Sequence, residues 1–129
     1  MKKRFIYLLI IATAFLLNLV WEYAHHVLYK HYKGGAITNI LLLRVSINDA
    51  LILLVIALAI RNIPVLEGQL WLLFITAFLI ATAIEWHALT TGRWAYGENM
   101  PVIPMLKTGL TPTIQLSLTG TVAYLLTFV

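Results

Sequence analysis

The sequence predicts an all-α integral membrane protein: a single domain, residues 1–129, that forms an antiparallel bundle of four transmembrane helices. The chain is 61% hydrophobic and only 11% charged, whereas a soluble domain carries about 25% charged residues. Its apolar residues gather in four stretches, each near the roughly 20 residues that a helix needs to cross a bilayer. The connections are short, so consecutive helices are expected to pack as antiparallel neighbours.

We place the four spans at residues 5–29, 39–60, 68–91 and 107–129. The basic cluster Lys2-Lys3-Arg4 precedes the first span, and the positive-inside rule then puts both termini in the cytoplasm. Five basic residues on the other side act against this orientation, and insertion in both orientations stays an alternative. The prediction is a multi-pass protein of the cell membrane.

Composition also restricts the chemistry and the partners. The chain has no cysteine, which excludes disulfides, thiolate metal ligands and thiol catalysis. Its net charge of +4 is spread over loops and helix ends, without the aromatic and basic face that nucleic acids require. We therefore expect membrane lipids as partners and no nucleic acid, and leave a homo-oligomer open.

Polar residues gather in one half of the predicted bundle. In an antiparallel arrangement the ends of the first and third spans meet the starts of the second and fourth at one face. These ends carry Glu22, His25, His26, Arg44, Asn48, Asp49, Glu85, His87, Arg93, Thr108, Thr111 and Gln115. The other half is apolar, so the sequence predicts a polar pocket in the non-cytoplasmic half.

The four candidate catalytic residues are Asp49, Glu85, His25 and Glu22. Counting back from Ile60 at ~1.5 Å per residue puts Asp49 about 16 Å into the membrane. A lone carboxylate there costs several kcal/mol, so it must be paired, hydrogen-bonded or protonated. Arg44, Arg93 and His25 are its expected partners. An acid at this depth indicates a functional site, although a purely structural ion pair is the alternative.

On the first span, Asn18, Glu22, His25 and Tyr29 follow one another at spacings of 4, 3 and 4 and so share one helical face. Glu22 and His25 have the i, i+3 spacing of carboxylate-bridged metal bundles, but such sites need a second pair. A hydrogen bond between the two residues and a metal site both stay open. Haem ligation by His25 or His26 with His87 is a third possibility, so metal and cofactor stay unknown.

A second group of residues is expected to bind the substrate: Arg93, Arg44, Asn48, Trp94, Tyr96 and Gln115. Arg93 lies between aromatic residues, where its guanidinium could contact a lipid phosphate. The segment that follows, residues 97–112, holds three prolines and two glycines and cannot form one regular helix. We expect it to be a lid or re-entrant hairpin over the pocket.

One combined pattern covers most of the chain. It reads Trp21-Glu22-x-x-His25-x-x-Leu28-Tyr29, Arg44-x-Ser46-x-x-Asp49-Ala50, Gly92-Arg93-Trp94-x-Tyr96, Met100-Pro101 and Gly109-Leu110-x-Pro112-x-x-Gln115-Leu116. The pattern resembles an uncharacterised family of small four-span prokaryotic membrane proteins. The resemblance implies a four-helix membrane protein and transfers no reaction. The small multidrug transporters differ, because their key glutamate lies mid-way along the first helix.

The leading functional hypothesis is an enzyme that acts on a lipid or isoprenoid head-group region by acid/base chemistry. Asp49 and Glu85 would supply the titrating carboxyls, His25 the proton relay and Arg93 the anion contact. Two alternatives come from other classes: an oligomeric transporter or channel subunit with Asp49 as coupling site, and a non-catalytic partner in a larger membrane complex.

Overall fold

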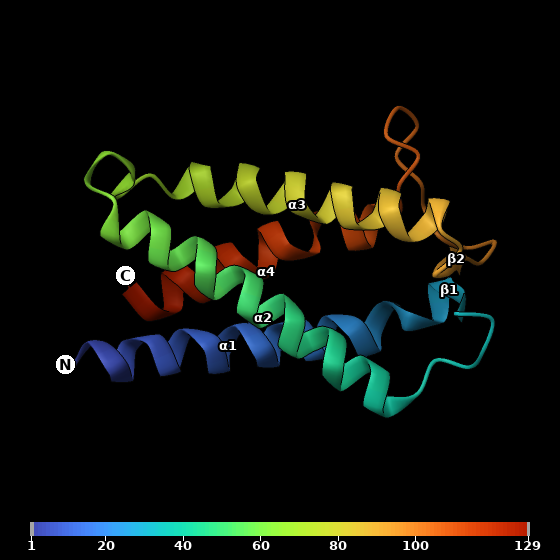
Figure 1. The fold of residues 1–129 in the computed structure, drawn as a ribbon, viewed down its shortest axis with the longest axis horizontal. Coiled ribbons are helices and arrows are strands. Elements are labelled where there is room, and N and C mark those ends of the chain that lie inside the picture. Colours follow the sequence, from blue (N-terminus) through green and yellow to red (C-terminus); the bar gives the residue numbers. More distant parts are fainter. Residues whose placement is uncertain (1, 129) are drawn as a thin grey trace.

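A computed structural model describes residues 2–128 and contains four long helices. They are α1 (Lys3–His25), α2 (Asn39–Asn62), α3 (Leu70–Thr90) and α4 (Leu110–Phe128). Short 3-10 turns follow α1 and α2. Two strands, β1 (Tyr29–Tyr32) and β2 (Trp94–Tyr96), pair antiparallel. Both chain ends lie at one end of the bundle and the small sheet lies at the other (Figure 1).

Three of the helices are long and apolar enough to cross a membrane, which indicates a multi-pass membrane protein. These candidate spans are Lys3–Leu28, Asn39–Asn62 and Leu70–Thr90. The predicted four-helix, mostly helical architecture is therefore confirmed. Helix α4 is not among the candidate spans: it has 19 residues, and Thr, Ser and Gln recur along it. A fourth crossing stays a prediction.

The structure corrects the all-α prediction at the sheet. Helix α1 ends at His25 rather than at residue 29, and Tyr29 instead pairs with Tyr96 in the sheet. Tyr and Trp favour extended backbone when half-buried, and this preference overrides the helical spacing at Tyr29. Helix α4 begins at Leu110 rather than at residue 107, because Lys107 has a left-handed φ of 59° that no α-helix continues.

The end of α3 turns the chain back to form the second strand. Gly92 has φ 70°, the conformation that glycine adopts without a steric penalty. Its N–H donates to the carbonyl of Leu89 at 3.4 Å, and the N–H of Arg93 donates to the carbonyl of Ala88 at 2.9 Å. This pair of bonds is the Schellman motif that ends many helices. It reverses the chain so that β2 can pair with β1.

Close helix packing fills the half of the bundle away from the sheet. Small residues on α1, α2, α3 and α4 allow the backbones to approach, as is usual between membrane helices; they include Ala14, Ala57, Ala77, Gly120 and Ala123. Leu53 and Leu73 are each 1% exposed and touch the position of Gly120. The predicted apolar half is therefore closely packed around these two leucines, and Glu22, Asp49 and Glu85 lie between this core and the sheet.

Candidate functional site

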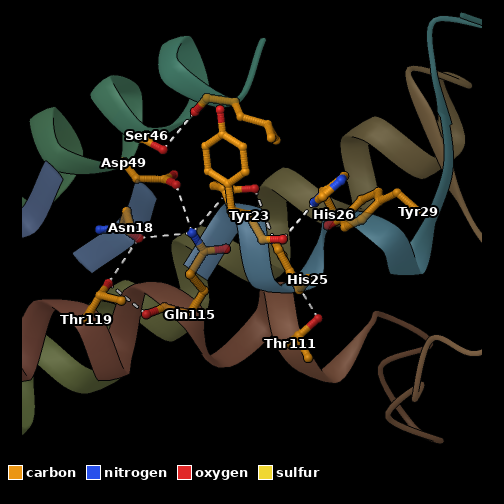
Figure 2. A network of polar contacts seen from close by, with 12 residues as sticks. Asn18, Tyr23, His25, His26, Tyr29, Ser46, Asp49, Thr111, Gln115 and Thr119 are labelled. Carbon is orange, nitrogen blue, oxygen red and sulfur yellow. Dashed lines mark hydrogen bonds and ion pairs between the residues drawn. The ribbon is translucent and has the colours of Figure 1, made fainter. Parts of the chain in front are cut away.

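The side-chain amide of Gln115 lies at the centre of a buried polar network. From α4, its Nε2 donates to Glu22 Oε1 on α1 at 2.9 Å and to Asp49 Oδ2 on α2 at 3.0 Å. It also lies 3.0 Å from Asn18 Oδ1, which accepts a second bond from Thr119 at 3.1 Å. Figure 2 shows the Gln115 nitrogen between Asp49 and Asn18, where it joins three helices.

His25 extends this network toward the start of α4. Its Nε2 lies 3.0 Å from Glu22 Oε2, and its Nδ1 lies 2.9 Å from the hydroxyl of Thr111. With the ring proton on Nε2, His25 donates to Glu22 and accepts from Thr111. Glu22 and His25 are both buried. The i, i+3 spacing left open a hydrogen bond or a metal site, and the structure shows the hydrogen bond between Glu22 and His25.

Glu85 on α3 is held by two tyrosines from the sheet. The hydroxyls of Tyr29 and Tyr96 both donate to Glu85 Oε1, at 2.9 and 2.8 Å. The backbone N–H of Gly109 in turn donates to the Tyr96 hydroxyl at 2.8 Å. The Tyr29 ring also meets the His25 ring edge-to-face at 5.4 Å. The sheet therefore positions the two hydroxyl donors of Glu85. The Tyr29 ring lies between this carboxyl and His25, so the two groups are neighbours.

Burial sets the protonation of these two tyrosines. It raises the pKa of Tyr29 well above its usual value, and the neighbouring Glu85 raises that pKa further. The pKa of Tyr96 is also raised, chiefly by burial and also by Glu85, although the N–H of Gly109 opposes the shift. Both hydroxyls therefore keep their protons and act as donors to Glu85.

The three acids line one cavity of about 100 Å³ between α1, α2, α3 and the sheet. Gln115 and Pro112 reach it from α4. The aromatic side of the wall is made by Tyr29, Tyr32 and Trp94, and the apolar side by Ile37, Leu41, Leu42, Val45, Ala81, Ile84 and Leu116. Carboxyls from three different helices thus face a space with largely apolar surroundings.

The sequence-predicted site residues fall into two groups. Glu22, His25, Asp49 and Gln115 form one network, and Glu85, Tyr96 and Trp94 lie at the same cavity or against it. Arg44, Asn48 and Arg93 instead have exposed side chains. None of these three lines the cavity.

The expected partners of Asp49 are not those the structure shows. The sequence predicted Arg44, Arg93 or His25 as the partner of Asp49, and the structure shows a hydrogen bond from Gln115 instead. Asp49 and Glu22 also meet at one nitrogen atom, Nε2 of Gln115. Helix α2, which carries Asp49, crosses the bundle obliquely (Figure 1).

Several contributors were missed or only partly anticipated by sequence reasoning. Asn18 and Tyr29 were placed on the face of Glu22 but not in the site, and Tyr32 and Thr119 were not assigned to it. Spacing along α1 was the signal for the first two. Tyr32 gave no such signal, because its place in the cavity wall depends on the pairing of β1 with β2.

The proline-rich segment does not cover the cavity. Part of this segment forms the orange loop that projects away from the helices in Figure 1, and Met105 within the segment is 94% exposed. The segment is pinned by the indole of Trp86, which donates to the carbonyl of Leu106 at 2.8 Å. Of the expected lid, residues 97–112, only Pro112 lines the cavity, and it does so from α4.

No metal site was found in the part of the chain that the structure describes. Within residues 2–128, no group of three or more His, Cys, Asp and Glu side chains is arranged to hold a metal ion. Both ring nitrogens of His25 already have hydrogen-bond partners, and His87 is exposed on α3. The geometry thus offers no support for the haem pairing of these two residues.

Comparison with known proteins gave no match: no family model, curated protein or solved structure is significantly similar to this chain. The resemblance to small four-span membrane proteins therefore stays an interpretation of the sequence pattern.

Proposed function

We propose that this protein is a membrane-embedded acid/base enzyme that acts on the head-group region of a lipid or isoprenoid substrate. One observation carries the proposal: Glu22, Asp49 and Glu85, from three separate helices, line one cavity with largely apolar walls. Carboxyls within membrane spans are costly to bury and mark functional sites by default. Acid/base catalysis needs such groups within reach of a bound substrate.

A row of neighbouring titratable groups supports this role. Thr111, His25 and Glu22 are joined at 2.9 and 3.0 Å. Gln115 donates to both Glu22 and Asp49 and carries no proton itself, but it holds the two carboxyls next to each other, so that a proton can pass between them. Histidine accepts and releases protons near neutral pH. Asp49 is the proposed group that exchanges a proton with the substrate, His25 relays that proton, and Glu85 with its two tyrosine donors is the second carboxyl.

The competing function, a transporter or channel subunit, needs a path through the bundle. In one protomer the core around Leu53, Leu73 and Gly120 fills the half beyond the cavity, so a path would require more than one copy. A non-catalytic partner in a larger complex requires no buried relay. The relay and the blocked half therefore favour the enzyme.

The test uses doubly labelled water, because the reaction is unknown. Wild-type protein in nanodiscs is incubated with membrane lipid extract in water enriched in deuterium and oxygen-18, and lipids are analysed by mass spectrometry. Proton transfer to carbon adds deuterium, and hydrolysis adds oxygen-18. We expect at least one lipid species to gain mass with wild type and with E67Q, which changes an exposed acid outside the cavity. The D49N and E85Q variants should abolish this gain. Absence of any wild-type-dependent mass change would refute the proposed activity.

A further inference from the structure

The cavity wall is acidic and lacks a strong cation. Three carboxyls line it, and its basic groups within residues 2–128 are His26 and His31, with no lysine or arginine. This deficit is local, since the whole chain has a net charge of +4. An anionic head group entering this space would find no lysine or arginine to pair with, and an unpaired charge costs free energy in a poorly solvated site.

Glu85, one of these acids, has a carboxyl oxygen that accepts no hydrogen bond from the described residues. Glu85 is 3% exposed, and both tyrosine hydroxyls donate to the same atom, Oε1. Among the described residues, Oε2 of Glu85 receives no hydrogen bond. Glu85 lines the cavity, so a ligand that brings N–H groups into this space can donate to the second oxygen.

The aromatic side of the cavity adds a second feature that suits a cation. The rings of Tyr29 and Trp94 meet edge-to-face at 6.0 Å, and Tyr32 stacks on Trp94 at 6.3 Å. Tyr29, Tyr32 and Trp94 all line the cavity. Aromatic faces attract ammonium groups through the ring quadrupole, and combined with carboxylates they form recurrent sites for amines.

The size and position of the cavity indicate what else the ligand carries. At about 100 Å³, it is smaller than the ~150 Å³ engineered cavity that holds benzene, so it accommodates a head group rather than a whole lipid. Its apolar side is formed by Leu41 and Val45 on α2 and Ile84 on α3, and Ile84 is partly exposed at 38%. An alkyl chain attached to the head group can leave between α2 and α3 into the bilayer.

We propose that the cavity binds the ammonium head group of a cationic amphiphile, with Glu85 and Asp49 as anionic contacts and Tyr29 and Trp94 as the aromatic wall. The inference rests on the proposed function and narrows its substrate class. It replaces the phosphate contact that the sequence assigned to Arg93, because Arg93 is exposed and does not line the cavity.

The experiment compares probes that differ only in their head group. Dodecylammonium, dodecanol and dodecyl phosphate are titrated against the wild-type protein in phosphatidylcholine nanodiscs, with empty nanodiscs subtracted for partition into lipid. We expect dodecylammonium to bind at least tenfold more tightly than either other probe, because only it offers charge-assisted N–H donors. Ethylammonium, which lacks the chain, should bind at least tenfold more weakly than dodecylammonium. Equal affinity of the two ammonium probes would assign the site to a soluble amine and overturn the amphiphile.

Variants then link the preference to the cavity. E85Q and D49N should each reduce dodecylammonium affinity at least tenfold and leave dodecanol unchanged, whereas E67Q, an equal change of charge outside the cavity, should have no effect. Tightest binding of dodecyl phosphate, or a preference for dodecylammonium that survives both E85Q and D49N, overturns the proposal.

The order of affinities of the three probes for the wild-type protein tests the ammonium site even if a variant fails to fold. If dodecylammonium binds but no lipid gains mass in labelled water, the proposed enzyme activity is refuted and the ammonium site stands. If lipids gain mass but dodecyl phosphate binds most tightly, the ammonium site is refuted and the enzyme activity stands.

Discussion

Gln115 on α4 donates a hydrogen bond to Asp49 on α2 at 3.0 Å, across 66 positions of sequence. The same Nε2 atom lies 2.9 Å from Glu22 on α1. An amide –NH₂ has two hydrogens, and with Asn18 it here faces three oxygen acceptors. Gln115 thus holds two acids of different helices at one point, and the geometry of the site depends on it.

Replacement of Gln115 by leucine should destabilise the bundle. Q115L keeps the volume but removes the donor, so two carboxyls and Asn18 lose a partner, and we expect the free energy of unfolding to fall by about 2 kcal/mol. Thermal unfolding in detergent measures the effect. The matched change Q69L, near the opposite end of the bundle, should cost under ~0.5 kcal/mol. Similar losses for both variants would mean that the network adds no stability.

An added methyl group at Gly120 should disturb the apolar core. A Cβ there would lie 2.5 Å from Leu53 Cδ2 and 3.1 Å from Leu73 Cδ2, and both leucines are fully buried. We expect G120A to cost about 1–3 kcal/mol, the usual range for overpacking. The control is G35A, whose Cβ would make an ordinary contact of 3.7 Å with the Tyr32 carbonyl. A G120A protein as heat-stable as G35A would contradict this packing.

Single cysteines can test the predicted crossings cleanly, because the chain has none of its own. The connection between α2 and α3, which contains residue 67, lies at the end of the bundle with both termini, and the segment between β2 and α4, which contains residue 107, leaves the bundle near the end with the sheet (Figure 1). We expect E67C and K107C to react with an impermeant thiol reagent from opposite sides of a vesicle. A cysteine added after residue 129 should react from the side of E67C. Reaction from the side of K107C would show that α4 does not cross.

The raised pKa values of Tyr29 and Tyr96 predict a loss of stability at alkaline pH. The folded protein retains protons that the unfolded chain releases above about pH 10, so stability is full below that pH and falls as the pH rises further. The Y29F/Y96F double variant should lose less stability above about pH 10 than wild type. Tyrosinate absorbance provides the direct check: folded wild type and the double variant should absorb equally at about pH 11. A larger signal from wild type would show that the two tyrosines ionise normally.

The sequence predicted the helices and the polar half of the bundle well, because both are local properties. Apolar length identifies α1, α2 and α3, and the i, i+3 spacing places Glu22 and His25 within reach of each other on one helical face. The helix boundaries depend on contacts that are distant in the sequence. Tyr29 fits the helical spacing of α1, and only its partner strand, which begins 65 positions later at Trp94, decides that it is extended.

The partners of each acid could not be read from the sequence, since they depend on how α2 crosses the bundle. Charge complementarity suggested Arg44 or Arg93 for Asp49, but these side chains are exposed, where hydration stabilises the guanidinium at no cost. The buried donor is an amide instead. The sequence by itself determined a helical chain with three segments long and apolar enough to span a membrane and with its costly polar groups in one half. Only the tertiary structure decided that three of its acids share one cavity, because the crossing angles and the pairing of two short strands determine which side chains meet.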